Sequence, residues 1–263
     1  MGESNMREKL RHFLRSLGRA VPLAESRCAG CGSIKRMHDA DHGASQCARC
    51  QAALAPQDSA ACPGCGQYPP ASQAISTGQA VPTLCGECRR GTARPWSLVL
   101  VHGPYAGTLK EHILSYKFNA RLDLGRRLQE CALAAYENGL QRHADMLPPD
   151  IIVPVPLHRA RLVGRGFNQA REISRLLSRR AAIPIVQEAL ERVRRTIPQM
   201  ELARAERAVN IRGAFSARRN LVEGKSVLLV DDIMTTGSTL EECARVLLGA
   251  GARRVDVLIL ARA

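Results

Sequence analysis

Four Cys-x-x-Cys pairs dominate the first third of the sequence and restrict how it can fold. The gap between the first two pairs is 15 residues, and the gap between the last two is 19 residues. Two thiolates at this spacing can bind one metal ion, and two pairs complete a tetrahedral four-sulfur site. The candidate ligands are Cys28, Cys31, Cys47, Cys50, Cys62, Cys65, Cys85 and Cys88. The pattern predicts two zinc-ribbon modules.

Other cysteine chemistries remain open at this point. Disulfides, redox-active thiols and iron–sulfur clusters also use cysteine, although clusters more often have other spacings. His38 or His42 could replace one thiolate, and the pairs could combine in sequence or crosswise. The first residues contain no apolar run long enough for a signal peptide or a membrane span, so we expect a cytoplasmic, reducing location, which disfavours disulfides. A closed four-sulfur site has no open coordination position, so this zinc should be structural.

Beyond Cys88, continuous apolar runs alternate with segments in which apolar residues recur at helical spacing. Apolar runs predict strands at Ser97–His102, Asp150–Val155, Ile183–Glu188, Ser226–Val230 and Val255–Leu260. Helical spacing predicts helices at Ala106–Tyr116, Leu122–Leu140, Asn168–Arg180 and Ser238–Leu248. Continuous apolar strands between helices indicate a parallel sheet that is covered on both faces. Cys131 and Cys243 lie on these helices and are expected to be small core residues.

The expected organisation therefore has three parts. A short amphipathic helical arm occupies 1–26, and a double zinc-ribbon domain occupies 27–92. An α/β domain with a Rossmann-like parallel sheet occupies 95–263.

The segment Val227–Thr239, VLLVDDIMTTGST, is the strongest functional signal. Its apolar strand leads into two carboxylates, Asp231 and Asp232. A loop of small hydroxyl residues around a glycine then precedes a helix: Thr235, Thr236, Gly237, Ser238 and Thr239. Backbone N–H groups in such a loop, together with the positive end of a helix dipole, favour a phosphate. Adjacent carboxylates suit ligand hydroxyls or Mg²⁺, so a ribose 5-phosphate satisfies both halves of the motif.

This segment resembles the 13-residue motif with which type I phosphoribosyltransferases bind phosphoribosyl pyrophosphate (PRPP). The resemblance implies that Asp231 and Asp232 bind the ribose 2′- and 3′-hydroxyls, that Thr235–Thr239 hold the 5-phosphate, and that PRPP binds with Mg²⁺. In the same family, a loop after another strand grips the pyrophosphate. The stretch Val153–Arg159 resembles that loop, with Leu157, His158 and Arg159 as the gripping residues.

If the protein transfers a phosphoribosyl group, cations must stabilise the departing pyrophosphate. The candidate catalytic residues are His158, Arg159 and Arg165. The stretch 194–210 would then close as a lid over the ligand. No residue in the sequence identifies the acceptor or its base, so enzymatic activity stays open.

Further motifs narrow the resemblance to one family. The runs Arg165–Gln169, Arg195–Gln199 and Gly213–Phe215, together with Tyr105 and Lys117–Phe118, look like the signature of the ComF family. A cysteine-rich module ahead of the α/β domain fits the same family. The resemblance covers the chain from about Arg27 to its end.

The ComF resemblance implies a PRPP-binding, phosphoribosyltransferase-like protein that acts in DNA uptake during natural transformation. Its expected partners are PRPP, single-stranded DNA, and DNA-uptake or helicase proteins. Two other hypotheses remain open at this point. One is an active phosphoribosyltransferase of nucleotide salvage or synthesis, and the other is a nucleic-acid-binding zinc-ribbon protein whose α/β domain is only a scaffold.

The charge distribution bears on the DNA expectation independently. The formal net charge is +14, and residues 150–225 hold 16 basic residues against 7 acidic ones. A nucleic-acid backbone would use this excess, although a solvated basic face is the alternative. Aromatic residues make up only 3% of the chain, so binding should be electrostatic and salt-sensitive. The arginines concerned are Arg161, Arg165, Arg171, Arg175, Arg179, Arg180, Arg192, Arg194, Arg195, Arg204, Arg207, Arg218 and Arg219.

Overall fold

A computed structural model describes residues 26–28, 30–35, 47–56, 61–69, 84–91, 94–119, 121–143, 146–194 and 210–263. Residues 1–25 of the expected arm, His38 and His42, and the stretch 195–209 of the expected lid lie outside them. Contacts divide the chain into two compact units, 1–51 and 52–263. The second pair of Cys-x-x-Cys turns therefore belongs to the same unit as the α/β sheet. The expected limits of three domains stay a prediction.

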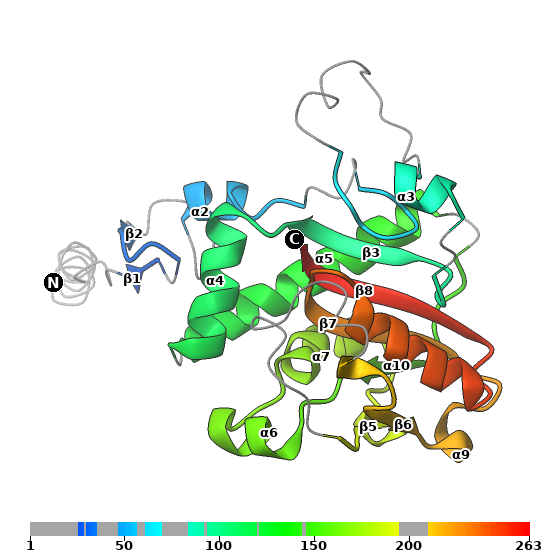
Figure 1. The fold of residues 1–263 in the computed structure, drawn as a ribbon. Coiled ribbons are helices and arrows are strands. Elements are labelled where there is room, and N and C mark those ends of the chain that lie inside the picture. The colour runs from blue at the N-terminus through cyan, green and yellow to red at the C-terminus, as the bar shows by residue number, and fades with distance from the viewer. Residues whose placement is uncertain are drawn as a thin grey trace, which may run out of the picture. The chain divides into compact units, whose positions relative to one another are not determined.

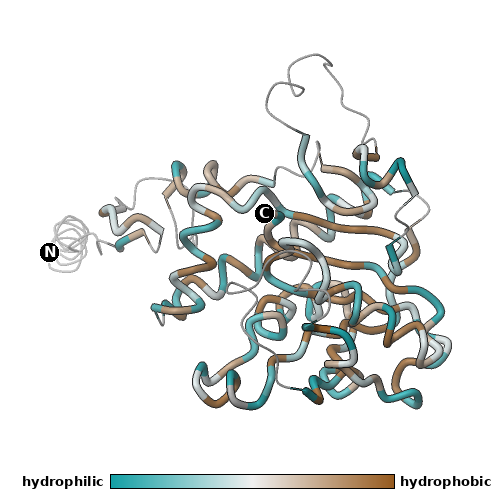
Figure 2. The backbone as a smooth tube through the Cα atoms, viewed as in Figure 1, coloured by the Kyte–Doolittle hydropathy of each residue, from teal (hydrophilic) through white to brown (hydrophobic). Residues whose placement is uncertain are grey.

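The larger unit is built on a parallel sheet of four strands (Figure 1). They are β3 (Val99–Pro104), β4 (Ile151–Pro154), β7 (Ser226–Met234) and β8 (Arg254–Arg262), in the order β3-β8-β7-β4. In the centre of the sheet, Leu229 pairs with Val257 on one side and with Val153 on the other. Figure 2 shows β3 and β8 as brown, hydrophobic bands, as expected of strands buried on both faces.

Helices cover both faces of this sheet. On one face lie α4 (Gly107–Phe118), α5 (Gly125–Arg142) and α7 (Gln169–Ala181), and on the other lies α10 (Ser238–Gly249). Successive side chains of a strand point to opposite faces. Accordingly, Leu228 and Val230 pack with α5 and α7, whereas Val227 and Leu229 pack with α10.

The face that carries α10 is completed by residues of the second cysteine module. Ala61 and Trp96 are buried in the same cluster as Val99 of β3 and Leu240 of α10. Partly buried Tyr68 packs against that cluster as well. The module therefore covers the part of the sheet near β3.

Short elements make up the rest. In the cysteine modules, β1 (Ser26–Arg27) and β2 (Ile34–Lys35) pair antiparallel, and α2 (Ala48–Ala52) and α3 (Gly86–Arg89) are single turns. In the α/β unit, α6 (Arg159–Arg165) follows β4, and β5 (Leu190–Arg192) pairs antiparallel with β6 (Phe215–Ala217). The remaining elements are η3 (Leu122–Leu124), η4 (Gln187–Ala189) and α9 (Arg219–Val222).

The predicted strand at Ile183–Glu188 is wrong. Only Ile185 pairs with the sheet, as a parallel bridge to Ile152. Ile152 N donates to the Pro184 carbonyl at 2.9 Å, and Val186 N donates to the Ile152 carbonyl at 2.9 Å. Pro184 has no N–H to continue the ladder, and the chain turns into η4 two residues after the bridge.

Other boundaries also differ from the prediction. The expected helix at Leu122–Leu140 begins as the 3₁₀ turn η3 and becomes α-helical at Gly125. Strand β7 continues four residues beyond Val230, so both aspartates lie inside the strand instead of after it. Cys131 and Cys243 are confirmed as core residues, since each is at most 2% exposed. Within the described residues, no helix is long and apolar enough to cross a membrane.

Candidate functional site

The eight paired cysteines form two separate tetrads. Cys28, Cys31, Cys47 and Cys50 form the first tetrad, and Cys62, Cys65, Cys85 and Cys88 form the second. In each tetrad the four sulfur atoms lie within 4.8 Å of one another. None of the chain's cysteines forms a disulfide, and the pairs combine in sequence.

The sulfur spacing fits zinc. A tetrahedron with zinc–sulfur bonds of about 2.3 Å has sulfur–sulfur edges of about 3.8 Å. The Sγ atoms of Cys31 and Cys47 are 3.8 Å apart, and those of Cys65 and Cys85 are 3.6 Å apart. Backbone amides point at the sulfurs, as thiolate ligands require. Cys47 N lies 3.3 Å from the sulfur of Cys28, and Cys85 N lies 3.3 Å from the sulfur of Cys62.

The glycine after each first Cys-x-x-Cys pair permits the tight turn. Gly32 and Gly66 have φ of +73° and +70°, a left-handed conformation that disfavours other residues. Their amides donate to the carbonyls of Cys28 and Cys62 at 2.8 and 2.7 Å. The two tetrads are thus built by the same local rule.

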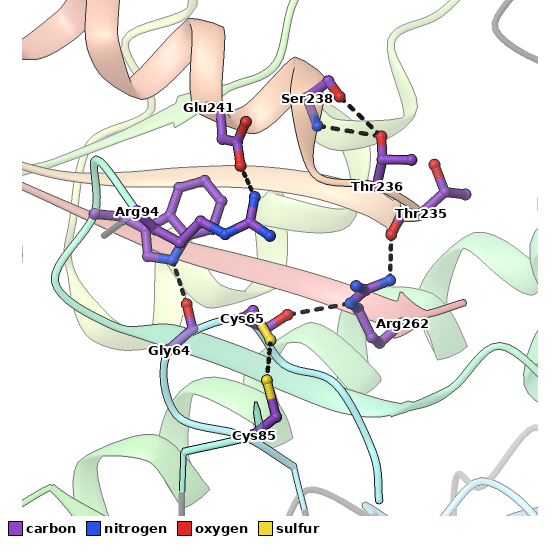
Figure 3. A network of polar contacts seen from close by, with 10 residues as sticks. Gly64, Cys65, Cys85, Arg94, Thr235, Thr236, Ser238, Glu241 and Arg262 are labelled. Atoms are coloured by element: carbon purple, nitrogen blue, oxygen red, sulfur yellow. Dashed lines mark hydrogen bonds and ion pairs between the residues drawn. The ribbon is translucent and has the colours of Figure 1, made fainter. Parts of the chain in front are cut away.

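The predicted phosphate loop lies at the carboxyl end of β7, between the strand and α10. Gly237 takes φ +87° at the N-cap of α10, and a β-carbon there would meet the Met234 sulfur at 3.2 Å. Thr236 Oγ1 is 2.9 Å from Ser238 Oγ, so the two hydroxyls are neighbours (Figure 3). The structure therefore brings a glycine turn, two hydroxyls and a helix N-terminus together, which is the chemistry of an anion site.

The acidic pair lies directly before this loop. Asp232 is buried, and its amide donates to Asp231 Oδ1 at 2.8 Å. Burial is the main cause that raises the pKa of Asp231 to about 7, and the neighbouring charge of Asp232 adds to it. The charges of Lys117 and Arg192 act in the opposite direction. Asp231 therefore titrates near neutral pH, well above the usual range of an aspartate.

Lys117 and Arg165 supply positive charge at this pair. Lys117 Nζ, at the end of α4, lies 2.7 Å from Asp232 Oδ2. The Arg165 guanidinium stacks over the Phe118 ring at 5.2 Å, and burial lowers the pKa of Arg165 while Asp232 opposes that shift. The sequence indicated Arg165 as a site residue, but it assigned no role to Lys117. Tertiary folding alone brings α4 to β7, so no local pattern could have assigned it.

The predicted pyrophosphate loop does not bring all of its residues to the acidic pair. His158 is half-buried, and its carbonyl accepts from the amides of Arg161 and Leu162 at the start of α6. The Arg159 side chain is 91% exposed and lies 3.8 Å from Glu191 of β5. Thr235 is exposed, whereas Thr239 is half-buried in the first turn of α10. Of the predicted catalytic arginines, Arg165 lies near the acidic pair, whereas Arg159 faces Glu191.

Two adjoining clefts lie beside α6 and α7. A cleft of about 490 Å³ is lined by residues that include Arg159, Arg192 and Arg218, and one of about 330 Å³ is lined by residues that include Arg175 and Arg179. Both clefts share Arg171, Gln187 and Glu188 as lining residues. Together they place several arginines of the basic segment along two adjoining clefts, which Glu172, Glu188 and Glu191 also line.

Comparison with known proteins matches these features. Residues 164–263 fit the family model of the phosphoribosyl transferase domain. "Competence protein F" of Haemophilus influenzae is 32% identical over 224 residues, which cover 83% of this chain and 97% of that protein. "DNA utilization protein YhgH" of Escherichia coli K12 is 35% identical over 178 residues, 68% of this chain and 77% of that protein.

A further relative and several solved structures are less similar to this chain. "Competence protein ComFC" of Bacillus subtilis is 26% identical over 78% of both chains. Among solved structures, glutamine PRPP amidotransferase from B. subtilis is 22% identical, with a TM-score of 0.36 over 56% of this chain and 30% of that one. A purine phosphoribosyltransferase from Pyrococcus horikoshii is 22% identical, with a TM-score of 0.29 over 51% of this chain and 73% of that one.

The parallel sheet and the predicted phosphate loop after β7 lie in the part of the chain that these similarities cover. The chain therefore belongs to the ComF/YhgH family of competence and DNA-utilization proteins, with a phosphoribosyltransferase domain behind cysteine tetrads that fit structural zinc.

Proposed function

We propose that this protein binds PRPP with Mg²⁺ at the end of β7 and handles single-stranded DNA during natural transformation, in the cytoplasm. The observation that carries the proposal is the juxtaposition of Asp231 and Asp232 with the loop at Gly237 and the N-terminus of α10. A ligand with both hydroxyls and a phosphate satisfies the two halves of this site. DNA-uptake or helicase proteins would be its partners.

Each group in the site has a role in this proposal. The carboxylates of Asp231 and Asp232 accept hydrogen bonds from the ribose hydroxyls. The amides and hydroxyls of Thr235–Thr239 hold the 5-phosphate. Mg²⁺, which prefers oxygen ligands and keeps several waters, would neutralise the pyrophosphate. Lys117 pairs with Asp232 Oδ2 at 2.7 Å, so it would neutralise this carboxylate beside the bound ribose.

The names of the relatives and the arginine clefts support the DNA part of the proposal. "Competence protein F" and "DNA utilization protein YhgH" are named for DNA uptake and DNA use. The clefts at Arg171 adjoin the segment that carries most of the chain's basic excess. Exposed arginines along a depression suit a phosphate backbone and make few base-specific contacts.

Thermal unfolding with and without PRPP and Mg²⁺ tests the ligand site. PRPP should stabilise the wild type, because a ligand that binds only the folded state raises its stability. Asp231→Asn with Asp232→Asn should abolish that stabilisation. Asp123→Asn is the matched control, since Asp123 pairs with Arg121 on the surface. No stabilisation of the wild type at saturating PRPP would contradict the proposed site.

Fluorescence anisotropy with a labelled single-stranded oligonucleotide tests the DNA site. Arg171→Gln with Arg175→Gln should weaken binding and lower the slope of log affinity against log salt by about 0.7 for each phosphate that is no longer neutralised. Arg126→Gln with Arg219→Gln is the matched control. These two exposed arginines pair with Glu130 and Glu223, as Arg171 and Arg175 pair with Glu172, but they do not line the clefts. An equal decrease in affinity in both double variants would mean that any surface arginine serves and that the clefts are not the site.

An active phosphoribosyltransferase of nucleotide salvage or synthesis is the second candidate function. Arg165 beside Asp232 favours it, because a partly buried cation near the ribose can stabilise the departing pyrophosphate. The candidate catalytic residues are His158, Arg159 and Arg165. Base-dependent release of pyrophosphate from PRPP, abolished in Arg165→Met but retained in Arg126→Gln, would establish this activity. No release with any nucleobase would leave PRPP as a bound ligand only.

A further inference from the structure

Arg262 connects the second cysteine tetrad to the phosphate loop. It is the last residue of β8 and is only 9% exposed. Its Nε donates to the carbonyl of Cys65, a tetrad residue, at 3.1 Å. Its Nη1 contacts the carbonyl of Met234, the last residue of β7, and that of Ala263. It also contacts the carbonyl of Thr235, the first residue of the predicted phosphate loop (Figure 3). One rigid guanidinium therefore binds both sites at once.

These bonds fix the groups that would face a phosphate. A peptide unit is planar and trans, so its N–H points away from its C=O. Because Arg262 holds the carbonyls of Met234 and Thr235, the N–H groups of Thr235 and Thr236 are held in the opposite direction. The orientation of two amides in the phosphate loop thus depends on a side chain that is itself held by the tetrad.

A second connection runs parallel to the first. The Trp96 indole N–H donates to the Gly64 carbonyl inside the Cys-x-x-Cys turn at 2.9 Å. The Arg94 guanidinium stacks over the Trp96 ring at 5.7 Å and pairs with Glu241 in the first turn of α10 (Figure 3). The tetrad is therefore linked to both ends of the loop, at Thr235 and at the start of α10.

Close packing leaves little freedom between the two sites. A β-carbon on Gly66 would lie 3.2 Å from Val99 Cγ1 and 3.7 Å from Met234 Cε. The Ala263 amide also donates to the Met234 carbonyl at 2.9 Å. A shift of the Cys-x-x-Cys turn would therefore move the residues that begin the loop.

From these contacts we propose that Arg262 is a positioning residue that couples zinc at the second tetrad to PRPP at the phosphate loop. Zinc fixes the turn that holds Arg262, Arg262 fixes the loop amides, and each ligand strengthens the binding of the other. The proposal rests on the PRPP site proposed above. The first tetrad, which lies in a separate compact unit, takes no part in the coupling.

The first experiment measures PRPP affinity by calorimetry in zinc-loaded protein. Arg262→Lys keeps the charge, but a single ammonium cannot reproduce the guanidinium fork. We expect about tenfold weaker PRPP binding, within the usual range of coupling between sites. Arg254→Lys is the matched control, because Arg254 begins β8 at the opposite end, where it binds the Leu147 carbonyl and pairs with the buried Asp256, and lysine keeps that charge. Its PRPP affinity should equal that of the wild type.

The second experiment measures how PRPP changes the affinity for zinc, which thermodynamic linkage requires to equal the effect of this zinc on PRPP affinity. A chelator competes for the zinc at equilibrium, and a colorimetric zinc indicator measures the fraction released. Trp96, the only tryptophan, reports the second tetrad separately through its fluorescence. PRPP should make zinc at this tetrad about tenfold harder to remove in the wild type, but not in Arg262→Lys. A Cys28→Ser, Cys31→Ser variant should keep the whole effect.

The outcomes separate the two proposals. If the wild type binds PRPP but PRPP does not change the affinity for zinc, the coupling is refuted and the PRPP site stands. If Arg262→Lys binds PRPP as tightly as the wild type, Arg262 does not position the loop. If the wild type binds no PRPP at all, the proposed function and this inference fail together. Zinc content of two per chain in Arg262→Lys confirms that any decrease in affinity does not come from an unfolded tetrad.

Discussion

The two cysteine tetrads follow one local rule but have different structural surroundings. Both use Cys-x-x-Cys-Gly turns with a left-handed glycine and an amide directed at a sulfur. In the first tetrad, Cys28 is only 2% exposed, but Cys31 is exposed, and Arg27 of β1 donates to the Gly32 carbonyl. In the second, Cys62 and Cys65 are each only 2% exposed, and Trp96 and Arg262 bind the turn.

This difference indicates that the same metal motif can serve two purposes. A tetrad within its own small unit stabilises mainly that unit, because a short segment cannot bury enough apolar surface to fold alone. A tetrad whose turn lies in the α/β unit also packs near the carboxyl ends of the strands, where parallel sheets of this kind generally bind ligands. Paired variants at equivalent positions of the two tetrads can test this comparison.

Loss of ligands should have the largest effect. Cys62→Ser with Cys65→Ser should lower the free energy of unfolding of the α/β unit by several kcal/mol, since structural zinc contributes about 10 kcal/mol or more to folding. Cys28→Ser with Cys31→Ser should leave that unit unchanged. Urea unfolding followed by Trp96 fluorescence measures the α/β unit in both variants. Equal destabilisation would show that the tetrads are energetically equivalent.

Asp231 should add a pH dependence to the stability of the α/β unit, beside the competition between protons and zinc at the thiolates of the second tetrad. Burial raises the pKa of Asp231 to about 7, above its value in the unfolded chain. Between these two pKa values, Asp231 is protonated in the folded state but ionised in the unfolded chain. Its contribution to the free energy of unfolding is therefore full below about pH 4 and is lost as pH rises toward 7. Asp231→Asn should remove a fall of at most about 1.4 kcal/mol per pH unit over that range.

Urea titrations between pH 4 and pH 8 in the absence of ligand measure this slope. The first-tetrad serine variant serves as the reference and should keep the wild-type slope. An identical slope in Asp231→Asn would assign the pH dependence to other groups.

The glycines that follow the turns give a smaller, matched test. Gly66→Ala should cost about 2 kcal/mol in the α/β unit, from left-handed strain of about 1 kcal/mol and contact with Val99 at 3.2 Å. Gly32→Ala pays the same strain, but its β-carbon would have no described atom within 4 Å. Chemical unfolding should therefore report a lower stability of the α/β unit for Gly66→Ala alone. A decrease in the stability of the α/β unit for both variants would contradict the difference proposed between the two tetrads.

The smallest effect should come from the side chains that bind the two turns. Trp96→Phe leaves the Gly64 carbonyl without its indole donor and should cost about 1–2 kcal/mol. Arg27→Gln removes an exposed bond to the Gly32 carbonyl and should change stability by less than about 0.5 kcal/mol. Thermal unfolding by circular dichroism compares the pair and does not depend on tryptophan fluorescence.

The sequence was sufficient wherever a feature is local. Cysteine spacing predicted both tetrads, and β7 with its loop and α10 were visible in one continuous stretch, because a strand, a turn and a helix start are set by neighbouring residues. Apolar runs also predicted all four strands of the parallel sheet. The strand expected at Ile183–Glu188 failed, because Pro184 and the turn at η4 left a single bridge where an apolar run indicated a ladder.

Tertiary structure decided the features that depend on distant residues. Lys117 reaches Asp232 only because α4 packs on the sheet that contains β7. Arg262 reaches Cys65 only because the second cysteine module covers the part of that sheet near β3. No spacing rule links residues so far apart in sequence, since their proximity results from the order of the strands in the folded sheet. The sequence alone therefore determined which chemical groups this protein carries, and the packing of its sheet determined which of them meet.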